Sequence, residues 1–173
     1  MDIPLSNTQI NKAVGPDSYD ILLYRDLHKY DSIDELFYDD DLLIILIESK
    51  AGVGHWVSLI KDGDTFIYFD SYGKGPDYWI PFLKPFYRNL LGEDIDEIKR
   101  LARGKKLIYN KMKLQGKDSS ICGRWQILFY GMHKLGYSLS EFQHYMRQNK
   151  KTSYDALCLS LVPIWNPLFF YIL

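Results

Sequence analysis

The sequence predicts an α+β protein in which a mixed or antiparallel central sheet packs on one buried helix. Three observations lead there: short β-rich runs in the first half, a tight turn that joins two of them, and a helix-length segment that is apolar around nearly its whole circumference. The 173 residues suffice for a single domain, 1–173, with a sizeable core. Apolar residues make up 47% of the chain and charged residues 25%, which excludes disordered and collagen-like classes.

The first half of the chain is expected to form strands after a less regular start. Thr8 to Val14 predicts a short helix that Gly15-Pro16 ends, and residues 17–38 predict an irregular polar segment. Three β-rich runs follow, and a turn at Lys61-Asp62-Gly63-Asp64 joins the last two into an antiparallel hairpin. These runs are Leu42 to Ile47, Trp56 to Ile60 and Thr65 to Phe69.

Between the hairpin and the buried helix the pattern is mixed. The glycines and prolines of residues 71–85 predict a loop with at most a short helix. Helical spacing then returns up to Gly104, in Ile95, Ile98 and Leu101. Lys106 to Lys113 alternates like a strand at a solvated edge of the sheet.

The last third is predicted to be helical. Residues 122–135 are apolar on all sides, which places this helix at the centre of the fold, with Gly136 as its cap. Two more helices are expected, at Phe142 to Arg147 after a capping box of Ser138 and Glu141, and at Tyr154 to Val162 after Thr152 or Ser153.

Charge, cysteine content and hydropathy limit the partners. The net charge of -1 shows none of the basic excess of a nucleic-acid-binding protein. Two cysteines are too few for a disulfide framework, so a reducing setting is expected. No secretory signal opens the chain and no apolar run reaches the ~20 residues that cross a bilayer, so we expect a cytosolic protein with no membrane partner. The apolar stretch Pro163 to Leu173 is interpreted as core or partner-facing, the alternative being a membrane-touching anchor.

Four residues stand where thiol acyl transfer would require them. Cys122 begins the buried helix, whose dipole and unpaired N–H groups favour a thiolate, more so beside an imidazolium. His55 and Asp70 are expected at the same end of the hairpin, so Asp70 would orient the imidazole and leave its other nitrogen for the sulfur. Gln115 would donate an amide N–H to the developing oxyanion, together with the Cys122 backbone N–H.

Each of these residues also has an ordinary structural interpretation. A cysteine in an apolar helix is commonly a small buried hydrophobe, which is our interpretation of Cys158. Asp70 alone would be a turn or cap residue, and Gln115 alone a solvated loop residue. Only the combination predicts a nucleophilic site. The spacing of His, Cys and acidic residues predicts no metal site, and AGVGH lacks the context of a phosphate loop, so no cofactor is expected.

Three blocks of the sequence, in this order, resemble the adenovirus-type cysteine endopeptidases, the adenain-like clan that also includes the SUMO and ubiquitin-like-modifier proteases. The blocks are GHWVSLI with His55, YFDSYG with Asp70, and LQGKDSSICGRW with Gln115 and Cys122. The ending Ser-Ser-Ile-Cys-Gly is closer to the viral enzymes, and FDSYG resembles proteases of virophages, large DNA viruses and related mobile elements.

The resemblance implies a papain-like cysteine protease fold with permuted motif order. It implies a thiol protease that cleaves viral structural precursors during virion maturation, in the host cytoplasm or viral factory and in the virion. The same site in a ubiquitin-like-modifier (SUMO-type) protease is the first alternative. An inactive capsid-binding scaffold of the same fold is the second, and the four intact residues argue against it.

The resemblance also implies a narrow groove for an extended substrate strand, often cleaved after small residues such as Gly. The predicted substrate-binding residues are Gly54, Trp56, Ser120 and Gly123, with Trp56 alternatively a core ring. Adenovirus enzymes use DNA and an activating peptide as partners. The run Lys99 to Lys117 has eight basic residues and no acid, so it would either track phosphates or form a solvated face that the acidic stretch Asp31 to Asp41 neutralises.

Overall fold

A five-stranded mixed sheet forms the centre of the computed structural model, which describes residues 4–6, 8–10, 20–37, 41–92 and 96–162. The strands lie side by side in sequence order: β1 (Asp20–Leu23), β2 (Leu42–Lys50), β3 (Val53–Asp62), β4 (Thr65–Phe69) and β5 (Lys106–Tyr109). The pairs β2–β3 and β3–β4 are antiparallel, whereas β1 runs parallel to β2 and β5 parallel to β4. The predicted α+β class and the predicted hairpin are confirmed.

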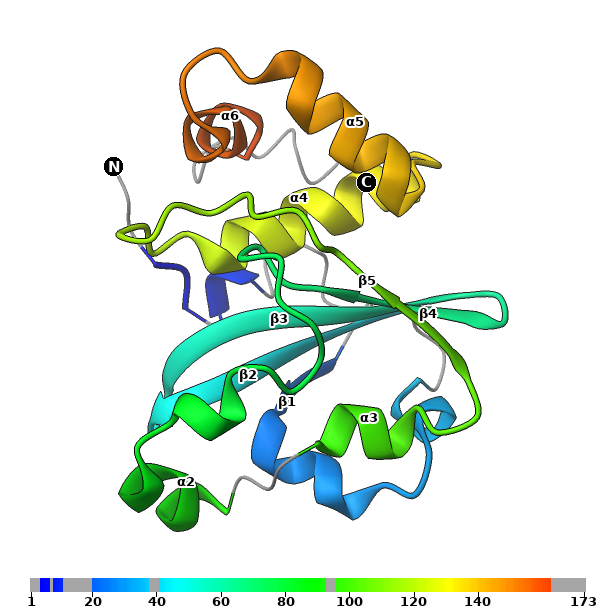
Figure 1. Cartoon of the computed structure of the whole chain (residues 1–173), viewed down its shortest axis with the longest axis vertical. Helices are drawn as coiled ribbons and strands as arrows, with labels where there is room; N and C mark the ends of the chain where they lie inside the picture. Colours follow the sequence, from blue (N-terminus) through cyan, green and yellow to red (C-terminus); the bar gives the residue numbers. More distant parts are fainter. Residues whose placement is uncertain (1–3, 7, 11–19, 38–40, 93–95, 163–173) are drawn as a thin grey trace.

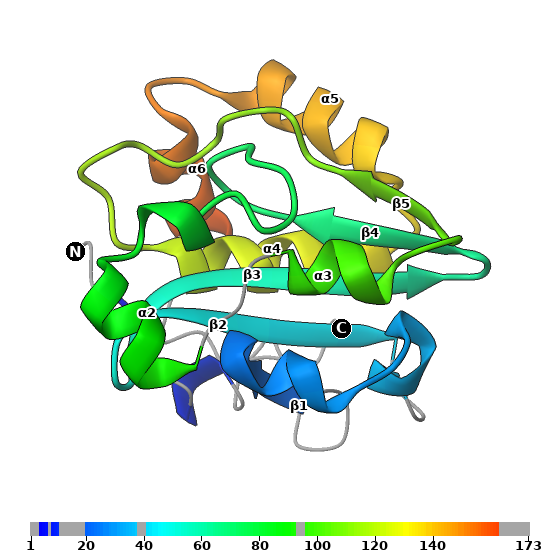
Figure 2. The ribbon, with the colours of Figure 1, turned by 60° about the horizontal axis from the view of Figure 1, so that its bottom comes forward.

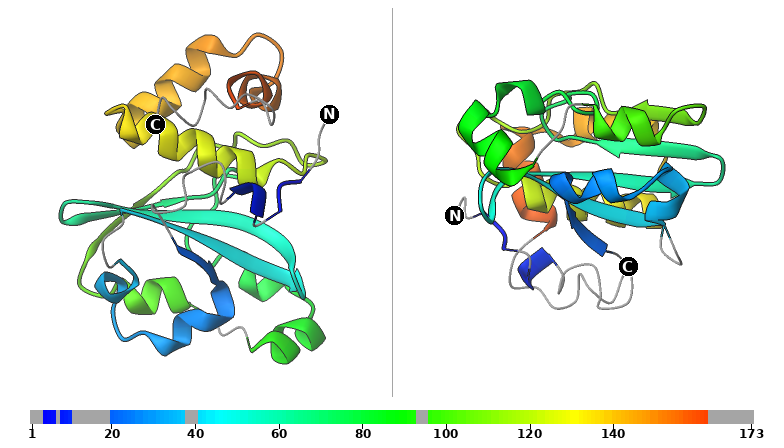
Figure 3. Two further views of the ribbon diagram at one scale, coloured as in Figure 1. Left: turned by 180° about the vertical axis from the view of Figure 1, so that it is seen from behind. Right: turned by 90° about the horizontal axis from the view of Figure 1, so that it is seen from below.

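Helices cover both faces of the sheet (Figure 1). On one side lie α4 (Cys122–Lys134), α5 (Leu139–Asn149) and α6 (Tyr154–Leu161). On the other lie α2 (Pro85–Leu91), α3 (Glu97–Leu101) and the 3₁₀ segments η1 (Tyr24–Lys29) and η2 (Ile33–Leu36), with η3 (Ile80–Phe82) just before α2. Figure 3 shows the same layers from behind and from below.

Strand β2 is buried on both faces because it separates two halves of the core. Side chains alternate across a strand, so its apolar residues divide between the two layers. Leu42, Ile44 and Leu46 pack in the cluster that includes α4, while Leu43, Ile45 and Ile47 pack with η1, η2 and α3. A continuous apolar run is the sequence that such a doubly covered strand needs.

Helix α4 is the central helix, and every residue from Cys122 to Met132 is buried. Its one amide side chain, Gln126, joins it to β3: Nε2 donates to the Trp56 carbonyl at 2.9 Å, and Oε1 accepts from Ser58 Oγ at 2.8 Å. A buried amide satisfied in this way fixes the helix in register with the strand. The predicted buried helix that begins at Cys122 is therefore confirmed.

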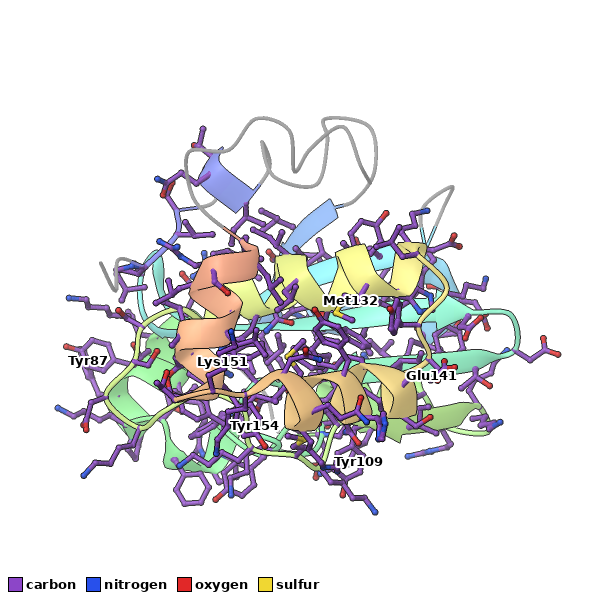
Figure 4. The ribbon with its side chains drawn as sticks, turned by 90° about the horizontal axis from the view of Figure 1, so that it is seen from above. Tyr87, Tyr109, Met132, Glu141, Lys151 and Tyr154 are labelled. Atoms are coloured by element: carbon purple, nitrogen blue, oxygen red, sulfur yellow. The ribbon has the colours of Figure 1, made fainter. Side chains whose placement is uncertain are left out.

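Helices α5 and α6 cover the outer side of α4. Their beginnings agree with the sequence: Ser138 and Glu141 form the capping box of α5, and the Ser153 hydroxyl accepts the Ala156 N–H at the start of α6. Figure 4 shows Met132 at the seam between α4 and α5, and Tyr154 and Lys151 where α5 passes into α6.

Two sequence predictions are wrong. Residues 20–37, expected to be irregular, contain β1, η1 and η2, with Tyr24 and Leu27 buried; short 3₁₀ turns bury single apolar residues without producing a recognisable period. The strand predicted from Lys106 to Lys113 ends at Tyr109, because the Asn110 side chain donates to the Asp70 and Met112 carbonyls and turns the chain.

Some predictions fall on residues that the structure does not describe. These are the end of the first helix at Gly15-Pro16, the contribution of Ile95, and the apolar stretch Pro163 to Leu173. In the described ranges, no helix combines the length and the apolarity needed to cross a membrane.

Candidate active site

The four predicted residues meet at one end of the sheet, around a cavity of about 660 Å³. His55, Gln115 and Cys122 line the cavity, and Asp70 lies behind His55. His55 comes from the start of β3, Asp70 follows β4, and Cys122 is the first residue of α4. Figure 2 shows that the loop after β4 and the loop before α4 both reach this end of the molecule.

Asp70 is fully buried and fixes the imidazole of His55. Its Oδ1 accepts from His55 Nε2 at 2.9 Å and from the Tyr72 N–H at 2.8 Å, while Oδ2 accepts from Trp79 Nε1 at 2.6 Å. A carboxylate held by three donors has little freedom to rotate. Because Nε2 is used by Asp70, Nδ1 is the nitrogen left for Cys122, the second hydrogen-bond partner of His55.

The electrostatics favour a charged His55. Burial alone would lower the pKa of the imidazole, but its hydrogen bonds to Asp70 and Cys122 outweigh burial and raise the pKa of His55 to about 9. Cys122 also stands at the first turn of a 13-residue helix, where backbone N–H groups lack carbonyl partners. An imidazolium and a helix N-terminus together favour the thiolate form of a cysteine.

Two aromatic rings enclose His55 that the sequence analysis did not identify. The Tyr72 and Trp79 ring centroids lie 5.2 and 5.4 Å from the imidazole centroid. They leave the ring largely shielded, with 16% of its side chain exposed. Both belong to the glycine- and proline-rich loop after β4, where side chains follow no period. The one signal in the sequence is that Tyr72 and Trp79 follow Asp70 closely along the chain.

That loop is anchored by a second buried aspartate. Asp77, in the left-handed region at φ 62°, accepts the Ile98 and Lys99 N–H groups, each at 3.0 Å, and the Tyr24 hydroxyl at 2.7 Å. Burial raises the pKa of Asp77. Through these bonds α3 and η1 fix the loop that carries Trp79, and with it the Asp70–His55 pair.

The side-chain amide of Gln115 is buried and oriented from both ends. Ser71 Oγ donates to its Oε1 at 2.7 Å, and its Nε2 donates to the Ser119 carbonyl at 2.6 Å. Since the hydroxyl occupies the carbonyl end, the NH₂ end is the one available to the cavity that Gln115 lines. A primary amide has two N–H bonds, so one remains for an oxyanion.

Asp155 of α6 holds the Gln115 loop against α4. Its Oδ2 accepts the Gly116 N–H at 2.8 Å, and its Oδ1 accepts the Trp125 Nε1–H at 3.0 Å. A Cβ on residue 116 would lie 2.9 Å from that same Oδ2, so a larger residue there would displace the Asp155 carboxylate. Ser71 and Asp155 were not identified from the sequence, because their partners lie 44 and 39 residues away.

The predicted substrate-binding residues have different positions. Gly54, Trp56 and Ser120 line the cavity. Trp56 is only 5% exposed and also belongs to the core. The same ring therefore lines the cavity and packs in the core, so the two interpretations of it are compatible. Gly123 is not among the described residues that line the cavity, and a Cβ there would contact Ile10, Leu5 and Trp56 at 3.1 to 3.5 Å. Its part in substrate binding stays a prediction.

The basic run Lys99 to Lys117 does not form one continuous stripe. Three residues near its start make ion pairs of 2.5 to 2.6 Å: Lys99 with Asp96, Arg100 with Glu97, and Lys105 with Asp34. The pair of Lys105 with Asp34 shows the predicted acidic stretch neutralising part of the run. A fourth pair, Lys117 with Asp118, is longer, at 3.9 Å. Lys113 and Lys117, at its far end, line the cavity.

Cys158 lies in the middle of α6, away from the cavity, and is fully buried. Burial, and next the nearby Asp155, raise the pKa of its thiol well above the usual range. Within the part of the chain that the structure describes, no three His, Cys, Asp or Glu side chains are grouped so that they could hold a metal ion.

Fold and site define an α+β protein whose central helix presents a cysteine to a buried histidine–aspartate pair. The chain is 32% identical, over 149 residues, to the "Uncharacterized protein V9" of Sputnik virophage, a match that covers 83% of each chain. It belongs to the same family as that virophage protein. No protein-family model matches the chain.

Two solved structures are similar at lower levels. The ASFV pS273R protease is 13% identical with a TM-score of 0.47, covering 99% of this chain and 67% of that one. The SUMO protease Ulp1 is 19% identical with a TM-score of 0.38, covering 80% and 71%. Similarity at these TM-scores does not establish a shared reaction, so the function has to be inferred from the geometry of the site.

Proposed function

We propose that the chain is a cysteine endopeptidase with Cys122 as nucleophile, His55 as general base and acid, Asp70 as the residue that orients His55, and Gln115 as oxyanion donor. The surroundings of His55 support this proposal: Nε2 bonds to Asp70 at 2.9 Å, and His55 and Cys122 line the same cavity, where the thiol contributes to the raised pKa of the imidazole. A thiol, an imidazole and an orienting carboxylate in this order are the parts of nucleophilic acyl transfer.

In the acylation step the Cys122 thiolate attacks the carbonyl carbon of the scissile peptide bond. The carbonyl oxygen gains the negative charge and accepts N–H groups from the Cys122 backbone and Gln115 Nε2. The C–N bond then breaks as the His55 imidazolium gives its Nδ1 proton to the departing amine. The products of this step are a thioester on Cys122 and a free amine.

In the deacylation step a water molecule attacks the thioester while neutral His55 accepts its proton. The sulfur leaves as a thiolate, the acid product departs, and the thiolate–imidazolium pair is restored. Asp70 keeps Nε2 protonated in both steps, so Nδ1 always faces the reacting atoms.

The substrates that we propose are viral structural precursor proteins cleaved during virion maturation, in an infected cell's cytoplasm, viral factory or virion. Kinship with a virophage protein and the adenain-like motif order support this substrate class. The permuted papain-like arrangement is part of the proposal: the strands that carry His55 and Asp70 precede the helix that carries Cys122.

The test is covalent labelling of the full chain with a peptide vinyl sulfone that ends in Gly-Gly or Gly-Ala, followed by intact mass and peptide mapping. We expect one adduct, on Cys122, which His55→Ala greatly slows and Cys158→Ala leaves unchanged. Absence of any adduct on the folded protein would contradict the proposal and favour the inactive scaffold. Labelling only by a folded ubiquitin-like modifier with a C-terminal vinyl sulfone would instead assign a modifier protease.

A further inference from the structure

Lysine side chains gather on one wall of the proposed catalytic cavity. Lys74 comes from the loop after β4, and Lys113 and Lys117 stand on either side of Gln115. The two loops pack closely, since a Cβ on Gly73 would lie 2.7 Å from the Met112 carbonyl carbon. Lys74 and Lys113 therefore extend from neighbouring stretches of backbone.

This wall carries positive charge, and no acidic side chain in the described ranges shares the lining with it. Among the described residues that line the cavity there is no Asp or Glu, although the whole chain has a net charge of -1. The β3 residues Val53, Gly54 and Trp56 also line the cavity and carry no charge, so apart from His55 the cationic side chains of the described lining are these lysines.

The cavity lysines are weakly paired compared with Lys99, Arg100 and Lys105, which each make an ion pair. Lys117 Nζ lies 3.9 Å from Asp118, with both side chains more than four-fifths exposed, so this pair neutralises little. Lys74 Nζ stands 4.5 Å from the Tyr78 ring centroid. Lys113 has no ion-pair partner in the part of the chain that the structure describes. These ammonium groups are available to an anionic ligand.

We propose that the cavity selects peptide segments with acidic side chains next to the scissile bond, recognised by Lys74, Lys113 and Lys117. This rests on the proposed endopeptidase function and adds a substrate class to it. A peptide backbone lying along the cavity would direct carboxylates to the lysine wall and leave the uncharged β3 residues to uncharged side chains. Complementary charge of this kind provides specificity more than raw affinity.

A nucleic acid is the other polyanion that lysines bind. The structure favours a peptide, because these lysines border the cavity that contains Cys122, whereas three basic residues nearer the start of the run are ion-paired. Nucleic-acid binding therefore becomes an outcome of the test.

The experiment is cleavage of a proteome-derived peptide library by the full chain, with the new N-termini identified by mass spectrometry. Cys122→Ala defines the background. We expect Asp and Glu to be enriched about tenfold at one or more positions within three or four residues of the cleaved bond. The double variant Lys113→Gln/Lys117→Gln should lose most of that enrichment, and Lys113→Glu/Lys117→Glu should reverse it toward Lys and Arg.

The matched control is Lys106→Gln/Lys151→Gln, which removes the same charge from exposed lysines that do not line the cavity, and should keep the enrichment. Cys122-dependent cleavage without acidic enrichment would overturn this inference and leave the endopeptidase intact. Absence of Cys122-dependent cleavage would overturn both. Stimulation by duplex DNA that depends on Lys113 and Lys117, without acidic enrichment, would assign these lysines to a nucleic acid.

Discussion

The start of α4 and the middle of α6 each contain a buried cysteine, yet the two cysteines differ in their access to the cavity and in their neighbours. Cys122 is 8% exposed, lines the cavity and bonds to His55. Cys158 is fully buried, and burial, with a smaller effect of Asp155, raises the pKa of its thiol. Burial alone therefore does not decide whether a thiol reacts; the position in the helix and the partner do.

Helix α6, whose cysteine does not reach the cavity, nevertheless helps to position the site at the start of α4. Asp155, three residues before Cys158, fixes the loop of Gln115 through Gly116 and fixes α4 through Trp125. α6 contributes the positioning residue Asp155 to the site, while its own cysteine, Cys158, packs in the core.

The largest effect is expected from removing the two thiols separately. Cys122→Ala should reduce peptide turnover by about 10⁶-fold, because no other group can form the thioester. Cys158→Ala removes only core volume, so turnover per folded molecule should stay within about twofold while the melting temperature falls. Turnover and thermal unfolding of both variants distinguish the roles, and an inactive but folded Cys158→Ala would show that the wrong thiol was chosen.

The next largest effect is expected at Asp70. Asp70→Asn should reduce kcat by about 10³ to 10⁴-fold, because an amide can present an N–H to the imidazole and favour the wrong tautomer. Asp77→Asn is the matched control: it weakens the anchor at α3 but leaves the His55 contact intact. That variant should lose stability in chemical denaturation with a much smaller loss of kcat. Equal losses of kcat would contradict the assigned roles.

A smaller effect is expected at the oxyanion donor. Gln115→Ala should reduce kcat by about 10² to 10³-fold with little change in KM, since the N–H is used mainly in the transition state. Ser71→Ala leaves the amide in place but frees it to rotate, so a loss of about tenfold is expected. Steady-state kinetics measure both, and Ser71→Thr should restore much of the loss by replacing the hydroxyl.

The smallest effect concerns pH and stability. Because the pKa of His55 is raised from 6.5 to about 9, its ion pair with Asp70 stabilises the fold fully below pH 6.5 and is lost as the pH rises through about 9. The His55 ring signals in NMR should titrate near pH 9, and Asp70→Asn should move that transition downward. Titration of His55 near its ordinary value in the unmodified chain would contradict the electrostatics described here.

Much of the site was predictable from sequence because its parts carry local signals. The turn between two β-rich runs predicts the β3–β4 hairpin, and the apolar run that begins at Cys122 predicts the start of α4. The hairpin brings His55 and Asp70 to the same end of the sheet, beyond its last β3–β4 pair at Ser58 and Phe69, and their side chains then meet through a hydrogen bond.

The rest depends on contacts between distant segments. Trp79, Ser71 and Asp155 act through single hydrogen bonds to partners that only tertiary packing supplies. η1 and η2 bury apolar residues without a helical or strand period, and β5 ends early because Asn110 bonds to the Asp70 carbonyl. Sequence patterns indicate helices and strands, whereas the roles of these residues depend on which helices and strands pack against one another.

The most direct test of the central claim is the rate at which iodoacetamide alkylates each cysteine of the folded full chain at pH 7, followed by peptide mapping. We expect fast modification of Cys122, at least about 100-fold slower modification of Cys122 in His55→Ala, and protection of Cys158 until the protein unfolds. Equal rates at the two cysteines, or a Cys122 rate unchanged by His55→Ala, would contradict the central claim.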